Sequence, residues 1–388
     1  MPPVILHLDL DAFFCAVEET RNPDLRGRAF AVGGKPAERG VVASCSYAAR
    51  QFGVRSAMPM SRALRLCPGL IIVSGRHRLY GEVSKQVMAR LHGLTPLVEQ
   101  ISIDEAFLDI SDLGENPERI ARRLQAGIRD ELNLPSSIGI ASNKLVAKIA
   151  TEVGKKAARS AGPPFGLTIV PPGEEAAFLA PLPADMLWGV GPKTSARLTE
   201  LGINTIGDIA KWPETELIRL FGENGRDLAR HAKGQDERAI VTERETKSIS
   251  QEVTFSRDVR DDKSLERTLR DQAAEVAAQL RNNQLAGSTI KLKLRWPDFT
   301  TLTRQTTLPH SIDQEEEIAG AALKLLKAVR RPGQAVRLIG VGVSGLGPPV
   351  RQLELWDAGS EKARKLQEAV DELREKYGDK VIHQGESQ

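Results

Sequence analysis

The sequence contains little cysteine and histidine and no long apolar run. Its three cysteines, Cys15, Cys45 and Cys67, form no C-x-x-C pair, and its six histidines form no H-E-x-x-H pattern. These absences argue against a structural zinc site and favour reduced thiols packed in a core. No apolar run reaches the roughly 20 residues of a membrane helix, and the N-terminal stretch lacks the basic region and cleavage site of a secretory signal. We therefore expect a cytoplasmic protein with no membrane partner.

Length and composition are those of a soluble chain with several domains. The 388 residues are too many for one compact core, and predict about two to four domains. Hydrophobic residues make up 41% and charged residues 27%, which are ordinary values. The net charge of +3 is too small to indicate a nucleic-acid partner by itself, so the distribution of the charges has to decide.

The first 165 residues alternate between strand and helix patterns. An apolar strand precedes Asp11, helical periodicity follows it, and a Gly- and Pro-rich insert of helices or loops continues to about residue 75. The elements predicted after it are a helix at 76–92, a hairpin at 97–112, a helix at 117–132, a strand at 136–142 and a helix at 143–153. Strand, helix, hairpin, helix, strand is the order of a split βαβ, ferredoxin-like core, which is an α+β fold.

The rest of the chain divides into three segments. Residues 166–233 read as short helices punctuated by glycines, and 234–243 are polar without a period and predict a linker. Residues 244–346 predict a second α/β unit of four strands and two helices, followed by a tail over 347–388.

Two adjacent acids, Asp104 and Glu105, interrupt the apolar hairpin "ISIDEAFLDI". At a turn both side chains could converge at one end of the sheet, and Asp9 and Asp11, two residues apart, share a face of the first strand. Carboxylates this close are costly unless a cation neutralises them, and few ligands plus substrate phosphates suit Mg²⁺. A polar turn or a strand end explains either motif alone. Together they favour a two-metal site for phosphoryl transfer.

Hydroxyl and cationic side chains that could bind a triphosphate occur in two places. In "SCSYAAR", Tyr47 and Arg50 lie three residues apart on one face of a helical turn, close to Ser44. In "LVAKIA", Lys148 lies on a predicted helix with apolar residues on either side of it. Taken singly, a surface salt bridge explains Arg50 and a snorkelling surface position explains Lys148 equally well.

The segment "GVGPKTSARL" has features of a helix-hairpin-helix. Gly189 and Gly191 would let backbone amides approach a partner closely, and the following helix, with Lys193 in its first turn, would favour phosphate at its N-terminus. A simple glycine cap is the alternative, but apolar flanks on both sides fit two helices. We therefore predict a sequence-independent contact with DNA backbone.

The segment "TIKLKLRW" alternates strictly between apolar and basic residues. Lys291, Lys293 and Arg295 face one side of the predicted strand, and Arg331 adds to the basic excess. Residues 244–346 hold seventeen Lys plus Arg against thirteen Asp plus Glu. Three cations with no interleaved acid favour phosphate contact over a solvated face. No aromatic stripe accompanies them, so base stacking is not predicted.

Five motifs in order resemble those of Y-family translesion DNA polymerases of the DNA polymerase IV (DinB) class. They are "HLDLDAFFCAVE", "SYAARQFGVRSAMP", "SIDEAFLDI", "GIASNKLVAKIA" and "LWGVGPKTSARL", and the resemblance covers about residues 4–357. It implies a right-hand layout with a palm over 1–10 and 76–165, fingers over 11–75, a thumb over 166–233 and a little finger over 244–346.

The resemblance also implies the chemistry. It implies template-directed addition of deoxynucleoside triphosphates to a primer on template DNA, with low fidelity, by two Mg²⁺ ions for which Mn²⁺ could substitute. The metal ligands would be Asp9, Asp104, Glu105 and the Leu10 carbonyl, with Asp11 structural. Phe14 would exclude a 2′-hydroxyl as a steric gate, with Phe13 packed beside it. The triphosphate contacts would be Ser44, Tyr47, Arg50 and Lys148.

The tail contains a short motif with a possible partner. "QLELW", with Gln352, Leu353, Leu355 and Trp356, resembles the peptide by which such polymerases dock on the sliding clamp. An ordinary tail segment is the alternative. One departure lies at 155–166, where "KAARSAGPPFG" replaces the family's usual Lys-Pro-Asn-Gly turn. We expect a monomer.

Two other functions fit part of the sequence. A phosphohydrolase could use Asp9 as a nucleophile after an apolar strand, but it would need a doubly wound fold. A non-catalytic DNA-binding scaffold would keep the helix-hairpin-helix and the basic strand while leaving the acids unused.

Overall fold

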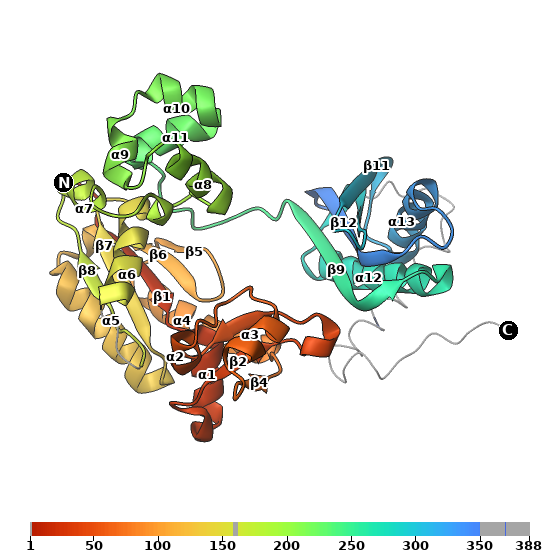
Figure 1. Ribbon diagram of the computed structural model, residues 1–388, viewed down its shortest axis with the longest axis horizontal. Helices are drawn as coiled ribbons and strands as arrows, with labels where there is room; N and C mark the ends of the chain where they lie inside the picture. The colour runs from red at the N-terminus through yellow and green to blue at the C-terminus, as the bar shows by residue number, and fades with distance from the viewer. Residues whose placement is uncertain (1, 158–161, 350–368, 370–388) are drawn as a thin grey trace. The chain divides into compact units, whose positions relative to one another are not determined.

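The computed structural model describes residues 2–157, 162–349 and 369. The chain divides into two compact units, Met1–Arg244 and Glu245–Gln388, and Figure 1 labels most of their elements. Among the described residues no helix combines the length and the apolar character that a membrane span requires.

A five-stranded sheet organises the first unit. Its spatial order is β5, β6, β1, β7, β8, with bounds β1 (Ile5–Leu10), β5 (Val98–Gln100), β6 (Glu105–Asp109), β7 (Ser136–Ala141) and β8 (Leu167–Ile169). All neighbours are antiparallel except β7 and β8. The first four strands have the order of a split βαβ core, which confirms the predicted α+β class.

Helices cover both faces of this sheet. The helices are α1 (Phe13–Arg21), α4 (His77–Leu94), α5 (Pro117–Leu132) and α6 (Lys144–Ala157). Leu6, Leu8 and Leu10 of β1 pack with α1, α4 and α5 in one apolar core. His7 points to the opposite face, where Thr151 of α6 hydrogen-bonds its Nδ1 at 2.8 Å. Because side chains alternate along a strand, Asp9 follows His7 onto the α6 side.

Close packing of α6 depends on one glycine. A Cβ at Gly139 in β7 would lie 2.1 Å from the carbonyl oxygen of Ala147. A side chain there would push α6 away from the sheet, so the absence of one brings the helix and its lysines to the end of β1.

The insert after α1 contains a sheet that the sequence analysis does not predict. Its order is β3, β2, β4, and its elements are β2 (Phe30–Gly33), β3 (Val42–Cys45), β4 (Ile71–Val73), α2 (Tyr47–Gln51) and α3 (Met60–Leu66). These strands are only three or four residues long, too short for a clear alternation. They have a small core of their own, which includes the buried Cys45 and Cys67.

The predicted helical segment is mostly helical, with two differences. Its helices are α7 (Glu175–Leu179), α8 (Pro192–Glu200), α9 (Ile206–Lys211), α10 (Glu214–Phe221) and α11 (Glu223–His231). The first difference is that β8, inside the predicted thumb range, pairs with β7 and extends the five-stranded sheet of the first unit. The second is that Ala184–Met186, which we expected to belong to a helix before the glycines, is a single 3₁₀ turn.

The predicted linker has no helix or strand, yet it is bound to the first unit. Glu99 of β5 is 2% exposed and accepts hydrogen bonds from Lys144 Nζ (2.8 Å), the Val241 N–H (3.0 Å) and Arg244 (2.5 Å). Lys144 also donates to the Ala239 carbonyl at 2.7 Å. This buried ion pair fixes the segment as far as Arg244.

The second unit is a four-stranded antiparallel sheet with two helices, as predicted. Its order is β11, β10, β12, β9, and its elements are β9 (Ser248–Val259), α12 (Asp262–Asn282), β10 (Ala286–Arg295), β11 (Thr301–Ile312), α13 (Glu315–Val329) and β12 (Val336–Gly347). Ile290, Leu292 and Leu294 join a core with both helices. The basic residues of β10 therefore lie on the opposite face.

Candidate active site

Asp9 and Glu105 meet at the end of two neighbouring strands. They are register partners on β1 and β6, so their side chains lie next to each other at this end of the sheet. Asp9 is 7% exposed. Burial raises the pKa of Asp9 well above its usual range, with the neighbouring Glu105 adding to the rise and Lys155 opposing it. Two carboxylates this close form a site of concentrated negative charge.

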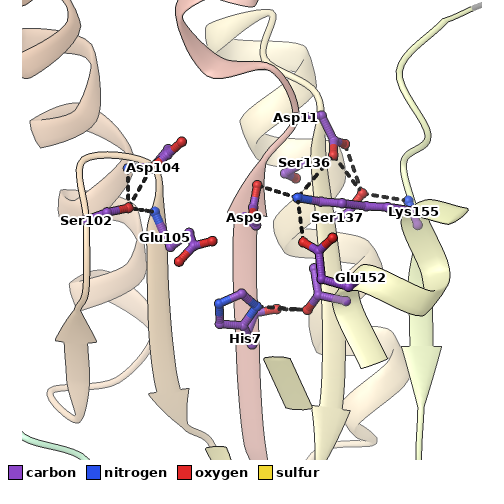
Figure 2. A network of polar contacts seen from close by, with 12 residues as sticks. His7, Asp9, Asp11, Ser102, Asp104, Glu105, Ser136, Ser137, Glu152 and Lys155 are labelled. Carbon is purple, nitrogen blue, oxygen red and sulfur yellow. Dashed lines mark hydrogen bonds and ion pairs between the residues drawn. The ribbon is translucent and has the colours of Figure 1, made fainter. Parts of the chain in front are cut away.

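Two lysines of α6 neutralise this charge. Lys155 Nζ lies 2.6 Å from Oδ1 of Asp9, 3.5 Å from Glu152 and 3.9 Å from Asp11, as Figure 2 shows. Lys148 Nζ lies 2.7 Å from Oε2 of Glu105. Seven residues apart, the two lysines lie two turns along one face of the helix. The sequence analysis proposed only Lys148, although the seven-residue spacing of the two lysines was visible in the sequence.

Asp11 is built into the fold beside this pair. It is 1% exposed and accepts hydrogen bonds from Ser137 Oγ at 3.0 and 2.9 Å. Burial raises its pKa to about 6, against the lowering effect of Lys155 and Ser137. The Gly166 N–H donates to the same Ser137 hydroxyl at 3.0 Å. This arrangement supports the structural role expected for Asp11.

Asp104 does not converge with Glu105. Ser102 Oγ donates to Asp104 Oδ1 at 2.5 Å, and the same hydroxyl accepts from the backbone N–H groups of Asp104 (3.2 Å) and Glu105 (3.0 Å). In Figure 2 Glu105 points toward β1, whereas Asp104 sits at the tip of the turn beside Ser102. The Asp104 carbonyl accepts from the Leu10 N–H at 3.0 Å, which joins the turn to the end of β1.

The donor set fits a hard divalent cation. Among the described residues no three His, Cys, Asp or Glu side chains are gathered into a preformed metal cluster. Mg²⁺ does not need one, because it binds through one or two carboxylates, waters and substrate phosphates. Asp9 and Glu105 supply two carboxylates, with Asp104 and the Leu10 carbonyl at the same strand ends.

The insert after α1 brings a second group of side chains close to Asp11 and Asp9. The Arg50 guanidinium lies 4.7 Å from the ring centre of Tyr47, and its buried Nε has no hydrogen-bond partner among the described residues. Burial raises the pKa of Tyr47, and the charges of Asp11 and Asp9 raise it further. Ser44 is buried on β3. Tyr47, Arg50 and Lys155 therefore all interact electrostatically with Asp11. The Arg50 guanidinium nitrogen without a partner in the described part of the chain is suited to binding an anionic ligand.

Phe13 and Phe14 begin α1 directly after Ala12, whose φ of 48° turns the chain from strand to helix. Phe13 is 2% exposed and belongs to the core. Phe14 is half-buried and stacks on Tyr80 of α4, with ring centres 4.3 Å apart and planes at 15°. This leaves Phe14 as a partly exposed ring close to the strand end that bears Asp9.

The glycines of the predicted helix-hairpin-helix have the expected backbone freedom. Gly189 has a φ of 102°, and a Cβ at Gly189 or Gly191 would meet no atom within 4 Å. Both glycines face open space at the start of α8, where Lys193 is exposed. A phosphate backbone could approach here, which remains a prediction.

The basic row on β10 has an acidic neighbour that the sequence analysis does not foresee. Lys293 Nζ lies 2.6 Å from Oε2 of Glu252 on β9. The two strands are separated by β12, where a Cβ at Gly340 would lie 2.6 Å from the Cβ of Glu252. The missing side chain lets Glu252 reach Lys293. The expectation of three cations without an interleaved acid is therefore wrong for Lys293, while Lys291 and Arg295 lie on the predicted face.

The remaining predicted residues lie in three parts of the chain. Arg331 lies in the turn after α13 and is exposed. The proposed clamp motif, Gln352, Leu353, Leu355 and Trp356, lies outside the described residues, as does part of the divergent segment after Lys155.

Known proteins resemble the chain over most of its length. Family models described as impB/mucB/samB family and impB/mucB/samB family C-terminal domain match residues 8–152 and 246–355. A DNA polymerase IV from Dehalococcoides mccartyi is 42% identical over 96% of this chain and 95% of the relative. A DNA polymerase IV from Streptomyces coelicolor is 44% identical over 94% of this chain and 75% of the relative.

Solved structures agree. A Y-family DNA polymerase chimera has a TM-score of 0.78 and 26% identity, covering 89% of this chain and 99% of its own. DinB from Sulfolobus solfataricus has a TM-score of 0.60 and 28% identity, covering 88% and 98%. With its two carboxylate-bearing strand ends and these relatives, the chain belongs to the impB/mucB/samB family and, within it, to the DNA polymerase IV group of Y-family DNA polymerases, which are DNA-directed DNA polymerases.

Proposed function

We propose that the protein adds deoxynucleotides to a primer 3′-hydroxyl on damaged as well as intact templates, with low fidelity and release of pyrophosphate. The observation that carries this proposal is the pairing of Asp9 with Glu105 at one end of the sheet. Cationic and hydroxyl groups from α2 and α6 surround that pair. Such a site suits the transfer of a phosphoryl group that arrives as a polyanion.

One set of residues in the site would bind the metal cations, and another set would bind the triphosphate. Asp9, Glu105, Asp104 and the Leu10 carbonyl would hold two Mg²⁺ ions, with Mn²⁺ as a possible substitute. When bound, such ions lower the pKa of the attacking hydroxyl and stabilise the leaving pyrophosphate. Tyr47, Arg50 and the α6 lysines would bind the triphosphate and offset the developing charge. Phe14 would lie under the sugar and exclude a 2′-hydroxyl.

DNA would be held by sequence-independent contacts. The open glycines before α8 offer backbone N–H groups to phosphates, and the basic face of β10 offers side-chain cations. Lys291 and Arg295 would make these contacts directly, and Lys293 would exchange Glu252 for a phosphate. The monomeric state and the clamp contact through 352–356 remain predictions from the sequence.

The fold weakens the phosphohydrolase alternative. That chemistry, with Asp9 as nucleophile, was expected to need a doubly wound parallel sheet. Here β1 is flanked on both sides by antiparallel strands. The scaffold alternative predicts DNA binding without catalysis and is decided by experiment.

The test is primer extension with Mg²⁺ and four deoxynucleotides, comparing the native chain, Asp104→Ala and Asp112→Ala. Asp112 is an exposed acid just beyond β6 and serves as the matched control. We expect the native and Asp112→Ala proteins to extend the primer and Asp104→Ala to bind DNA without extending it. If neither the native chain nor the control extends a primer that both bind, the scaffold function replaces the polymerase.

A further inference from the structure

A buried tyrosine packs against one face of the Phe14 ring. Tyr80 on α4 is fully buried, and its ring stacks on Phe14 at 4.3 Å with nearly parallel planes. Phe13 meets Tyr80 edge-on at 6.5 Å, and His77 meets Phe14 edge-on at 6.0 Å. Stacked and edge-to-face pairs of this kind have defined geometry. The orientation of the Phe14 ring therefore depends on the position of the Tyr80 ring.

A buried carboxylate fixes Tyr80 in turn. Glu18 lies one turn beyond Phe14 on α1 and is 1% exposed. The Tyr80 hydroxyl donates to Oε1 of Glu18 at 2.5 Å. Arg76 donates to the same oxygen through Nε at 3.0 Å and to Oε2 through its terminal nitrogen. Burying a carboxylate is costly unless it is paired and hydrogen-bonded, so this satisfied arrangement has one preferred geometry.

The helix that carries Tyr80 also contacts the catalytic hairpin. Ser84, one turn after Tyr80, donates its hydroxyl to the Ile103 carbonyl at 2.5 Å. Ile103 directly precedes Asp104. Helix α4 therefore links the Phe14 ring to the hairpin that bears proposed metal ligands. The spacing between the ring and these ligands does not depend on α1 alone.

We propose that Tyr80 is a positioning residue for sugar selection, and that Glu18 acts through its hydrogen bond to Tyr80. Fixed by Glu18, the Tyr80 ring sets the plane of Phe14 against the sugar of the incoming nucleotide. A shift of about 1 Å in such a contact is enough to change a rate substantially, and a 2′-hydroxyl adds only one atom. This inference rests on the steric-gate role proposed for Phe14.

The test compares selectivity rather than activity. The variants are Tyr80→Leu, Tyr80→Phe, Glu18→Gln and the double variant Tyr80→Phe/Glu18→Gln. For each, the incorporation efficiency (kcat/KM) of a deoxynucleotide is divided by that of the matching ribonucleotide on one primer-template. We expect Tyr80→Leu to lower this ratio about tenfold, and Tyr80→Phe and Glu18→Gln about threefold each. The double variant should fall no further than either single change, because both changes act on the same hydrogen bond.

The control on the same helix is Glu82→Gln. Glu82 pairs with Arg78 on the exposed side of α4, and its loss should leave the ratio unchanged. Tyr80→Phe and Glu18→Gln keep the shape of the core, so they carry the test if Tyr80→Leu fails to fold in a thermal unfolding scan. Equal losses for both sugars in every variant would mean a purely structural role and overturn the inference.

The variant Phe14→Ala tests the steric-gate role of Phe14 separately from the positioning role of Tyr80. If Phe14→Ala leaves the ratio unchanged, the gate assignment fails. If Phe14→Ala lowers the ratio while the Tyr80 and Glu18 variants do not, the gate stands and the positioning role of Tyr80 is wrong.

Discussion

The Nζ of Lys155 lies 2.6 Å from Oδ1 of Asp9. Lys148, two turns earlier on α6, lies 2.7 Å from Oε2 of Glu105. Each of the two meeting carboxylates thus has its own amine, and both amines come from one helix face. Burial works against the charge on Lys155, but the surrounding carboxylates outweigh burial and raise the pKa of the amine, so it stays charged at neutral pH. The sheet end therefore carries balanced charge of both signs.

Replacing Lys155 should weaken nucleotide binding. Lys155 shares the neighbourhood of Asp11 with Tyr47 and Arg50, which places it among the groups proposed for the triphosphate. We expect Lys155→Ala to raise the KM for deoxynucleotides about 10- to 100-fold, the range for losing one charged hydrogen bond, with unchanged DNA affinity. Steady-state primer extension measures this. Lys156→Ala, its exposed neighbour on α6, should match the native protein, and a normal KM in Lys155→Ala would contradict the assignment.

Ser102 should matter for the geometry of the acidic turn. Its hydroxyl contacts both Asp104 and Glu105, so Ser102→Ala should loosen both carboxylates. We expect about a tenfold lower kcat and a higher Mg²⁺ requirement, because catalytic geometry tolerates little displacement. Ser111, which makes a similar contact with Asp109 at the far end of β6, provides the control. Equal kinetics for Ser102→Ala and Ser111→Ala would show that the turn does not depend on this hydroxyl.

Glu99 should contribute strongly to the stability of the first unit. Its removal leaves Lys144, which is 4% exposed, without a counter-charge. Glu99→Ala should therefore lower the free energy of unfolding by about 3 to 5 kcal/mol, measured by urea denaturation. Glu131→Ala removes an exposed pair with Arg90 and should cost about 1 kcal/mol or less. A comparable loss in both variants would contradict a special role for the buried pair.

The same residue should give the protein a pH dependence in acid. Burial pushes the pKa of Glu99 up, but hydrogen bonds from Lys144, the Val241 N–H and Arg244 outweigh it, so the pKa lies below the ordinary 4.5. Because the folded pKa is the lower one, the stabilisation is complete above pH 4.5 and is lost as the pH falls through the folded pKa. Below pH 4.5 we expect the free energy of unfolding to fall less steeply in Glu99→Gln than in the native protein. Parallel curves would contradict the lowered pKa.

Glu252 should moderate DNA binding through Lys293. The pair is about half exposed, so it is weak and open to competition by a phosphate. We expect Glu252→Gln to strengthen DNA binding about two- to threefold at low salt, and Lys293→Ala to lower the salt slope of log Kd by about 1. Fluorescence anisotropy against salt concentration measures both. Glu266→Gln removes a comparable pair with Lys327 on the helical side, and an equal effect there would exclude a local role.

Much of the fold followed from local patterns in the chain. The apolar strand before Asp11, the alternation of β10 and the long helices α4 and α5 all lie where the periodicity predicts them. The pattern succeeds there because one face of each element is buried in a single core. The short strands of the insert and β8 were missed because three or four residues carry too little periodicity.

The sequence by itself determined which residues carry charge at the end of the sheet, since Asp9 and Glu105 come at the ends of recognisable strands. Only the tertiary structure decided their partners. Ser102 holds Asp104 apart from Glu105, Lys155 reaches Asp9, and Glu252 crosses over a glycine to Lys293. Tyr80, which is far from Phe14 in the chain, stacks against the Phe14 ring. Such contacts depend on how separate elements pack against one another, and no local spacing along the chain encodes them.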